Sequence, residues 1–164
     1  MYYYLYLVRH AQSADKQIGQ TDKERAITPV GLEQAKAVGN FLKEKSIIPE
    51  LIISSSALRA NTTAQTLAEI LPYRLDRIIL KDDLYDANVS DLLQIVSRIS
   101  VDINKVMVVG HNPGISLLVD HLTKEQNRNL FPSELVVIKF EFSNWLDIDR
   151  TVGRLEERYH KFNE

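Results

Sequence analysis

YYYLYLVRHA, residues 2–11, is an aromatic and apolar run that ends directly in Arg9 and His10. The run predicts a buried strand over residues 3–8. Such a strand delivers the guanidinium of Arg9 and the imidazole of His10 to the carboxyl edge of a sheet, where open α/β folds bind their ligands. The stretch therefore predicts both the start of an α/β fold and the place of its functional site.

Two later stretches repeat this arrangement. The run LIIS, residues 51–54, leads to Arg59, and the run VMVV, residues 106–109, leads to Gly110 and His111. Because the carboxyl ends of parallel strands meet at one edge of a sheet, we expect these loops to converge. Two arginines and two histidines gathered there would form an anion-binding pocket that contains a nucleophile.

Helical patterns alternate with the apolar runs. The expected strands cover residues 3–8, 50–54, 77–80, 105–109 and 134–142. The expected helices follow the N-cap candidates Thr28, Ser55 or Ser56, Ser90 and Asn112, and they cover residues 29–45, 57–71, 90–99 and 113–122. The stretches expected to be irregular are residues 12–27 and 84–89, while 153–159 is either an edge strand or a helix.

This alternation of strands and helices predicts an α/β protein. We expect a three-layer α/β/α sandwich with a mostly parallel central sheet and helices on both faces. The strand over residues 134–142 follows a helix and could pair in either direction. The length of 164 residues predicts a single domain over residues 1–164.

The composition excludes several classes of function. Lys and Arg total 20 and Asp and Glu total 22, so the net charge of −2 argues against a general nucleic-acid or membrane-surface binder. Cysteine is absent, which excludes disulfides, thiolate metal sites and a cysteine nucleophile. The sequence shows no signal peptide, and no apolar run approaches the roughly 20 residues of a membrane helix. We therefore expect a soluble, cytoplasmic protein.

His10 has the chemistry of a nucleophile. A neutral imidazole can attack phosphorus through one nitrogen and form a phosphohistidine, provided that the other nitrogen keeps its proton on a backbone carbonyl. The guanidinium of Arg9 matches the oxygens of a phosphoryl group. The alternative is that both residues simply form a polar strand end, and the pair alone does not decide between these interpretations.

Arg59 and His111 also allow two interpretations each. Arg59 stands at the start of a predicted helix, whose N-terminus favours an anion, but it could equally be a solvated surface arginine. His111 follows Gly110, which permits close backbone approach, and could donate a hydrogen bond to a transferring phosphoryl group. Its alternative is a turn histidine that bonds to the local backbone.

Together these motifs resemble one known family. Arg-His-Ala at 9–11, Arg-Ala at 59–60 and Gly-His-Asn-Pro at 110–113 are similar to the histidine phosphatase superfamily, the phosphoglycerate mutase-like group. The resemblance covers nearly the whole chain and is nearest to the small SixA-type phosphohistidine phosphatases, which share the stretch that reads DKERAITPVG here, residues 22–31. It implies a phosphoglycerate mutase-like fold, no metal and no other cofactor. It also implies a nucleophilic His10 and a phosphate pocket of Arg9, His10, Arg59 and His111.

The sequence departs from the family pattern in two places. Ser55-Ser56 replaces the usual Ser-Pro, and Thr62 replaces a common Gln, which affects helix packing rather than the phosphate arginine. Larger relatives take their proton donor from an acidic residue after the third strand. Asp86 is the matching candidate here, with Asp82 and Asp83 nearby; alternatively, all three are solvated loop acids.

The resulting hypothesis is a two-step hydrolase of phosphoric monoesters or phosphoramidates. Because the short chain leaves little room for a lid, we expect its partner to be a phosphorylated protein in signal transduction, with a phosphohistidine domain as substrate. A small phosphate ester is the alternative substrate. A mutase and a non-catalytic phosphate-binding module are rival functions. No nucleic-acid or membrane partner is expected, and the protein is expected to be a monomer or weak dimer.

The hypothesis carries an expectation about pH. Arg9 and Arg59 should favour the neutral form of His10, so activity should fall in acid as His10 becomes protonated. A rate that stays flat well below pH 5 would contradict this expectation.

Overall fold

The computed structural model describes residues 1–161 and contains one six-stranded sheet in the order β3-β2-β4-β1-β5-β6. The strands are β1 (Tyr2–Arg9), β2 (Leu51–Ser55), β3 (Ile79–Lys81), β4 (Lys105–Gly110), β5 (Leu135–Glu141) and β6 (Arg154–Tyr159). The α-helices are α1 (Pro29–Glu44), α2 (Leu58–Ile70), α3 (Val89–Ser97) and α4 (Gly114–Thr123). The 3-10 helices are η1 (Asp22–Glu24), η2 (Leu75–Arg77), η3 (Asp82–Leu84) and η4 (Trp145–Arg150).

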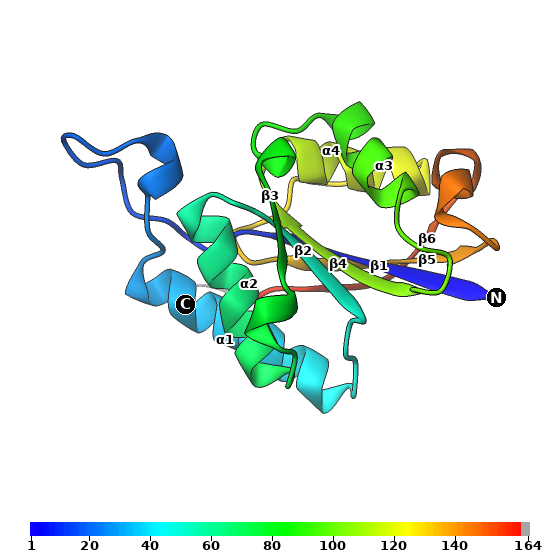
Figure 1. Cartoon of the computed structure of the whole chain (residues 1–164), viewed down its shortest axis with the longest axis horizontal. Coiled ribbons are helices and arrows are strands. Elements are labelled where there is room, and N and C mark those ends of the chain that lie inside the picture. The colour runs from blue at the N-terminus through cyan, green and yellow to red at the C-terminus, as the bar shows by residue number, and fades with distance from the viewer. Residues whose placement is uncertain (162–164) are drawn as a thin grey trace.

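The helices cover both faces of the sheet (Figure 1). α1 and α2 pack on one face, and α3 and α4 pack on the other. β1, β4, β2 and β3 pair in parallel, whereas β5 is antiparallel to β1 and β6 is antiparallel to β5. The prediction of a three-layer α/β/α sandwich with a mostly parallel sheet is therefore confirmed. The direction of β5, which the sequence left undecided, is antiparallel to β1.

β1 lies inside the sheet because its side chains are apolar on both faces. Tyr3, Leu5 and Leu7 pack into the core beneath α3 and α4. Tyr6 and Val8, which alternate with them, pack into the core beneath α1 and α2. Burying a large apolar side chain stabilises a fold by roughly 1.5–3 kcal/mol, so this doubly buried strand anchors both layers.

The start of α2 differs from the prediction. Ala57 occupies the N-cap position, and no serine side chain caps the helix. Ser55 still belongs to β2, and its hydroxyl accepts the N–H of Ala57 at 3.2 Å while also contacting a ring nitrogen of His111. The serine is thus drawn into the tertiary structure and is unavailable as a cap.

Two further helix starts also differ. α3 begins at Val89 because Asn88, rather than Ser90, is its N-cap and exchanges hydrogen bonds with Asp91 in a capping box. α4 begins at Gly114, and its N-cap position is Pro113 rather than Asn112. The Asn112 side chain instead joins α4 to the following loop, because it accepts from Ser116 and donates to the carbonyl of Leu130.

The remaining differences lie at the edges of the sheet. The strand expected over 77–80 is the short strand β3, shifted toward the C-terminus and placed between two 3-10 helices. The expected loop over 12–27 contains η1 and an isolated bridge between Ser13 and Ile27. Residues 154–159 form the edge strand β6 rather than a helix. No helix among residues 1–161 combines the length and the apolar character that crossing a bilayer requires.

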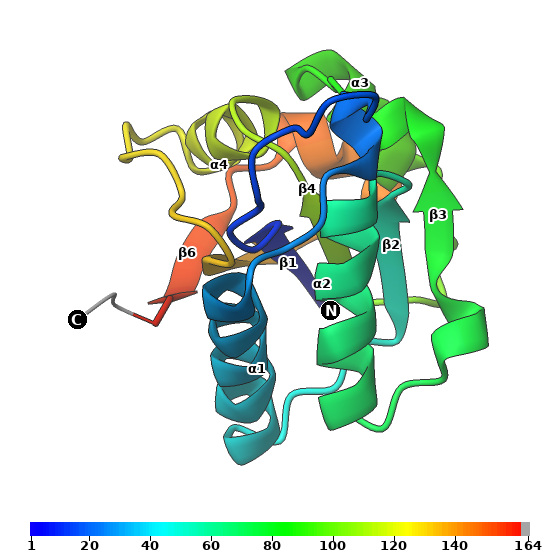
Figure 2. The ribbon, with the colours of Figure 1, turned by 90° about the vertical axis from the view of Figure 1, so that its left-hand side faces the viewer.

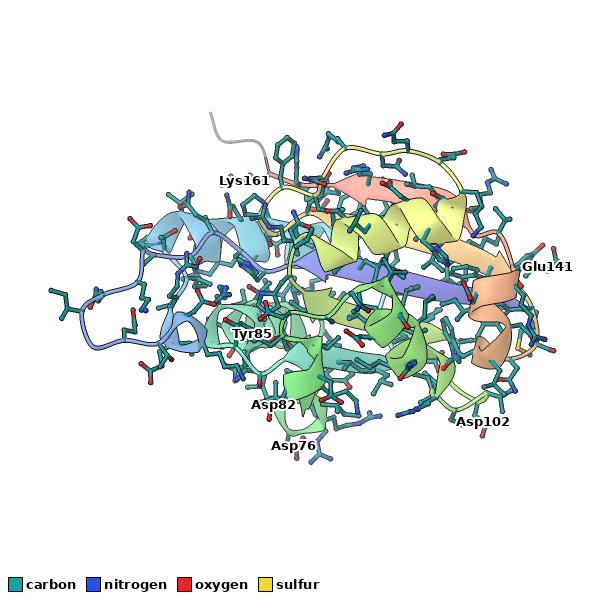
Figure 3. All side chains as sticks on the ribbon, turned by 90° about the horizontal axis from the view of Figure 1, so that it is seen from above. Asp76, Asp82, Tyr85, Asp102, Glu141 and Lys161 are labelled. Carbon is teal, nitrogen blue, oxygen red and sulfur yellow. The ribbon has the colours of Figure 1, made fainter. Side chains whose placement is uncertain are left out.

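The loops after β1, β2 and β4 meet at one end of the molecule. Figure 2 looks onto this end, where the segment between β1 and α1 crosses in front of the sheet. Figure 3 shows Asp102 and Glu141 at the opposite end. The convergence follows from the parallel pairing of β1 with β4 and of β4 with β2, which brings the three carboxyl ends to a common edge.

Candidate active site

The backbone of His10 is held by the sheet on both sides. Its N–H donates to the carbonyl of Gly110 at 3.0 Å, and its carbonyl accepts the N–H of Ser133 at 3.0 Å. These bonds extend the pairing of β1 with β4 and with β5 by one residue. His10 therefore projects from a rigid strand end rather than from a free loop.

The two residues after His10 are held by α1 and α2, the helices on one face of the sheet. The N–H of Ala11 donates to the hydroxyl of Thr63 on α2 at 2.9 Å, and the N–H of Gln12 donates to the side-chain carbonyl of Gln34 on α1 at 3.1 Å. Gly31 on α1 lies so close to this segment that a Cβ would come within 2.3 Å of the carbonyl oxygen of Gln12. Only glycine allows this approach, so α1 fixes the chain beyond the histidine.

The His10 ring has the tautomer that a nucleophile needs. Nδ1 lies 2.8 Å from the carbonyl oxygen of Ala11. Because a carbonyl only accepts hydrogen bonds, Nδ1 carries the proton and Nε2 keeps its lone pair. The residue is 8% exposed, and burial lowers the pKa of His10 to about 3. The charges of Arg59 and Arg9 act in the same direction, whereas the hydrogen bond to the carbonyl of Ala11 opposes the shift.

His111 lies next to this ring. The two ring centroids are 5.1 Å apart, and Nε2 of His111 is hydrogen-bonded to the hydroxyl of Ser55 at 2.8 Å. Tyr85 meets the same ring edge-on, with 5.5 Å between centroids. Burial, reinforced by the charge of Arg59, lowers the pKa of His111 to about 4. Both imidazoles are therefore neutral at pH 7.

The two arginines each keep one buried donor without a partner. Nη1 of Arg9 donates to the carbonyl of Leu130 at 3.0 Å, and Nη1 of Arg59 donates to the carbonyl of Asp22 at 2.7 Å. Within residues 1–161, the Nε atoms of both arginines are buried and have no hydrogen-bond partner. An unsatisfied buried donor costs about 1–3 kcal/mol, so both sites suit an anionic ligand. Arg59 is only 6% exposed, which rules out the solvated surface arginine.

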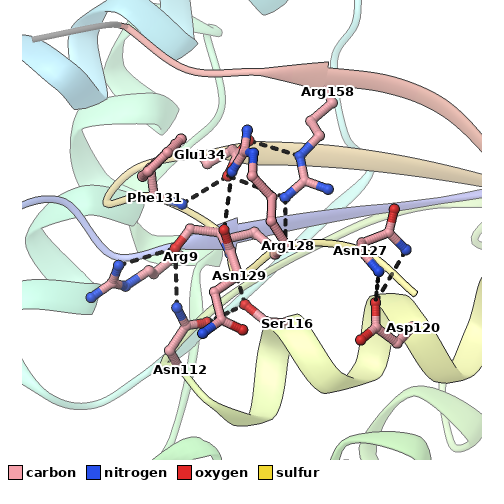
Figure 4. A network of polar contacts seen from close by, with 11 residues as sticks. Arg9, Asn112, Ser116, Asp120, Asn127, Arg128, Asn129, Phe131, Glu134 and Arg158 are labelled. Atoms are coloured by element: carbon pink, nitrogen blue, oxygen red, sulfur yellow. Dashed lines mark hydrogen bonds and ion pairs between the residues drawn. The ribbon is translucent and has the colours of Figure 1, made fainter. Parts of the chain in front are cut away.

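The carbonyl that orients Arg9 belongs to a braced loop (Figure 4). Glu134, at the end of this loop, is bonded by Arg128 at 2.6 Å and by Arg158 at 2.8 Å. Burial of Glu134 opposes ionisation, but these two arginines hold its pKa below the usual value. Its backbone carbonyl accepts the N–H of Arg9 at 3.2 Å. The ion pairs around this buried carboxylate thus anchor the loop beside Arg9.

Asp22 is a further residue of the site, to which the sequence pattern alone gives no role. This aspartate contacts Arg59 through Oδ2 at 2.9 Å and Arg25 through Oδ1 at 3.1 Å, and it accepts the hydroxyl of Tyr85. These donors, with the tyrosine first, hold the pKa of Asp22 well below its usual range. Asp22 is the first residue of the stretch 22–31, which is part of the family resemblance. The sequence therefore marked this aspartate as a motif residue but did not show that it contacts Arg59.

The acidic candidates for the proton donor lie at the rim. Asp86 is exposed, and its backbone is left-handed at φ 56°. Its charge raises the pKa of His111, which opposes the effect of burial on that ring. Asp82, exposed on η3, accepts a hydrogen bond from Ser56 at the β3 edge (Figure 3). Asp86 therefore lies close enough to influence His111, but it is exposed, unlike the buried side chains of His10 and Arg59.

The described residues also settle the surroundings of the remaining histidines. His121 forms a surface pair with Asp149 at 2.5 Å, and the ring of His160 packs on Phe131 with 4.6 Å between centroids. Between residues 1 and 161, His, Asp and Glu side chains form no group of three or more that could hold a metal ion.

Comparisons with known proteins identify relatives of the whole fold. A model of the histidine phosphatase superfamily (branch 1) matches residues 5–98. The uncharacterized protein Rv1276c of Mycobacterium tuberculosis (strain ATCC 25618 / H37Rv) is 24% identical over 151 residues, which cover 87% of this chain and 92% of the relative.

Solved structures match over nearly the full length. A protein of Nakamurella multipartitia, titled a candidate phosphohistidine phosphatase SixA, has 22% identity and a TM-score of 0.82, and the match covers 98% of this chain and 96% of that one. The mycobacterial glucosyl-3-phosphoglycerate phosphatase Rv2419c, solved with VO3, has 17% identity and a TM-score of 0.72, with 94% and 98% covered. These likenesses establish the fold.

Proposed function

The chain belongs to the histidine phosphatase superfamily and shares the fold of its SixA-type members, and from this premise we propose that it hydrolyses phosphoryl groups through a phosphohistidine at His10. The family match supports phosphatase activity. The observation that carries the proposal is the neutral His10, with Nε2 unprotonated, beside two arginines whose buried Nε donors have no partner among residues 1–161.

In the first step, the lone pair on Nε2 of His10 forms a bond to phosphorus. The bond from phosphorus to the leaving nitrogen or oxygen breaks, and the leaving atom takes the electron pair and then a proton. Arg9, Arg59 and His111 hold the phosphoryl oxygens, where negative charge increases in the transition state. Asp86 at the rim is the candidate that supplies the proton.

In the second step, water attacks the phosphohistidine. The oxygen of the water bonds to phosphorus, the N–P bond breaks and its electron pair returns to Nε2 of His10. The proton released by the water passes to solvent, and inorganic phosphate leaves. Because the oxygens of the phosphoryl group carry similar charge in both steps, the same cationic pocket stabilises both transition states.

We propose protein phosphohistidine as the substrate class, in cytoplasmic signal transduction. The exposed position of Asp86 supports this choice. The nitrogen leaving group of a phosphoramidate departs more easily than the alkoxide of an ester, so its departure needs less help from a general acid. The segment between β1 and α1 extends beyond the body of the molecule (Figure 1), and its residue Asp22 contacts Arg59. A monomeric or weakly dimeric protein would offer this segment to a protein partner.

A small phosphorylated metabolite is the second candidate substrate. It is favoured by the likeness to the structure of the mycobacterial glucosyl-3-phosphoglycerate phosphatase Rv2419c. A mutase would need further cations that return the phosphoryl group to a bound metabolite, and a purely binding module would not need the tautomer seen at His10.

Substrate competition tests the choice between protein and metabolite. We expect kcat/KM for a phosphohistidine-bearing phosphotransfer protein to exceed that for p-nitrophenyl phosphate or a phosphoglycerate by at least about 100-fold, because only a protein partner supplies binding energy remote from phosphorus. Inorganic phosphate release and isomerised product are measured in parallel. Preference for the small esters would contradict the protein substrate, and an isomerised product would favour the mutase.

The pH at which activity falls through protonation of His10 is expected to be lower than the sequence suggests. Neutral His10 is the reactive form, and its pKa of about 3 keeps it neutral through mildly acidic pH. The loss of activity due to His10 should therefore begin near pH 4, so the rate is expected to stay flat to a lower pH than the sequence indicated. We expect the ring NMR signals of His10 and His111 to stay at neutral-imidazole positions from pH 7.5 to about 5, with free imidazole as the reference.

The same shift affects stability. An unfolded histidine takes up its proton near pH 6.5, whereas folded His10 does so only near pH 3, so the unfolded state binds more protons between these values. The free energy of unfolding should fall as the pH decreases through this window. A titration midpoint for His10 between pH 6 and 7 would contradict both expectations.

A further inference from the structure

Asp22 lies at the start of η1, in the segment that joins β1 to α1, and contacts Arg59 twice. We propose that Asp22 is a positioning residue for Arg59, so that this segment forms part of the phosphoryl site. The inference deepens the proposed function and rests on it, because it takes Arg59 as a ligand of the phosphoryl group.

The contacts of the Arg59 guanidinium leave one of its edges free. Arginine has five N–H donors in a planar fork. Both terminal nitrogens of Arg59 donate to Asp22, Nη1 to the backbone carbonyl at 2.7 Å and Nη2 to Oδ2 at 2.9 Å. Asp22 thus occupies the end of the fork, while the buried Nε has no partner among residues 1–161. The edge that contains Nε is left for an anion.

The guanidinium of Arg59 is directed toward the histidine pair. The ring of Tyr85 joins Arg59 to the histidine pair, because its centroid lies 5.9 Å from Cζ of Arg59 and 5.5 Å from the ring centroid of His111. In agreement with this placement, the charge of Arg59 lowers the pKa of both His10 and His111. A buried arginine held at its end has little rotational freedom, and its free edge is therefore oriented before substrate arrives. Such preorganisation is what makes a fixed donor effective in a transition state.

Asp22 is itself held by two further donors. Arg25 donates to Oδ1 of Asp22 at 3.1 Å, and the hydroxyl of Tyr85 donates to Oδ2. Arg25 also donates through Nε to the carbonyl of Ala14 and through Nη2 to the hydroxyl of Ser13, both at 2.9 Å. The segment is therefore braced across its width, and it fixes the carboxylate relative to α2.

A carboxylate near the pocket has a second, opposite consequence. Its negative charge repels a phosphoryl dianion, so Asp22 would weaken phosphate binding if repulsion outweighed its positioning of Arg59. The two roles predict opposite signs when the charge of Asp22 is removed. Measurement of phosphate affinity can therefore separate them.

The test uses the full chain with inorganic phosphate as the probe. We expect Asp22→Asn to weaken phosphate binding, measured by calorimetry, and to lower kcat/KM for a phosphoramidate, each by about tenfold, the effect of one charge-assisted hydrogen bond. Asp15→Asn removes an exposed charge from the same segment and should change both values less than about twofold. Unchanged or tighter phosphate binding by Asp22→Asn would overturn the proposal.

A double-mutant cycle separates positioning from a general structural effect. In an Arg59→Lys background there is no Nε edge to orient, so Asp22→Asn should add less than about a twofold loss. A full tenfold loss in that background would contradict the proposal. Circular dichroism checks folding; should Asp22→Asn fail to fold, Asp22→Glu replaces it, and wild-type phosphate affinity in that variant would equally contradict the proposal.

The controls also separate this proposal from the proposed function. A wild-type protein that neither binds phosphate nor hydrolyses any phosphorylated substrate would refute the proposed function. A wild-type protein that does both, with an Asp22→Asn variant equal to it, would refute only the role of Asp22.

Discussion

Replacing His10 with alanine is expected to lower phosphate release by at least about 10³-fold, because the variant lacks the nitrogen that bonds to phosphorus in the proposed mechanism. The neighbouring arginines would still bind the phosphoryl group, so substrate affinity should change much less than turnover. The measurement is single-turnover phosphate release, combined with intact mass spectrometry of protein quenched during turnover. We expect the wild type, and not His10→Ala, to gain the mass of one phosphoryl group.

The matched control is His121→Ala. This histidine lies on the surface of α4 and pairs with Asp149, far along the chain from the strand end that carries His10. Its removal should leave phosphate release within about twofold of the wild type. Phosphoryl transfer to His10→Ala, or turnover at the wild-type rate, would show that another residue is the nucleophile.

Replacing Arg59 with alanine is the second large change. The variant loses the buried Nε donor and the positive charge beside both imidazoles. Removal of one preorganised donor to a transition-state anion typically costs about 10²–10³-fold in rate, and we expect a loss of kcat/KM in this range. Phosphate should also bind more weakly, because the proposed mechanism leaves the product beside the same guanidinium.

A conservative variant distinguishes charge from geometry. Arg59→Lys keeps the charge but lacks the planar fork, and it should recover only part of the lost kcat/KM. Arg74→Ala serves as the control, since Arg74 is exposed and its guanidinium pairs only with Asp76 among the described side chains. Wild-type activity in Arg59→Ala, measured alongside a wild-type response of Arg74→Ala, would remove Arg59 from the site.

The fold was predictable where local pattern and global packing agree. The unbroken apolar run of β1 predicted a buried inner strand, and Tyr3 and Tyr6 are indeed buried on opposite faces. The helix starts were less predictable because a serine or asparagine side chain can bond locally or across the fold. Ser55 and Asn112 were expected as caps, yet His111 and Leu130 provide their tertiary partners.

In the candidate site, too, some features could be predicted from the sequence and others depend on contacts across the fold. Its histidines and arginines follow strand ends, and a sheet collects strand ends at one edge, so their approach could be expected from the order of the elements. The contacts of Asp22 with Tyr85 and Arg59 join residues separated by 63 and 37 positions. No periodicity in a single sequence encodes which loop residue meets which side chain across such distances.

The sequence by itself determined the alternation of strands and helices, the polar residues at the strand ends and the absence of cysteine chemistry. These properties are local, because they depend on which side chains neighbour one another along the chain. Only the tertiary structure decided the tautomer and depressed pKa of His10, the partners of each guanidinium and the antiparallel direction of β5. They depend on burial and on contacts between distant segments, which exist only once the two cores have formed around β1.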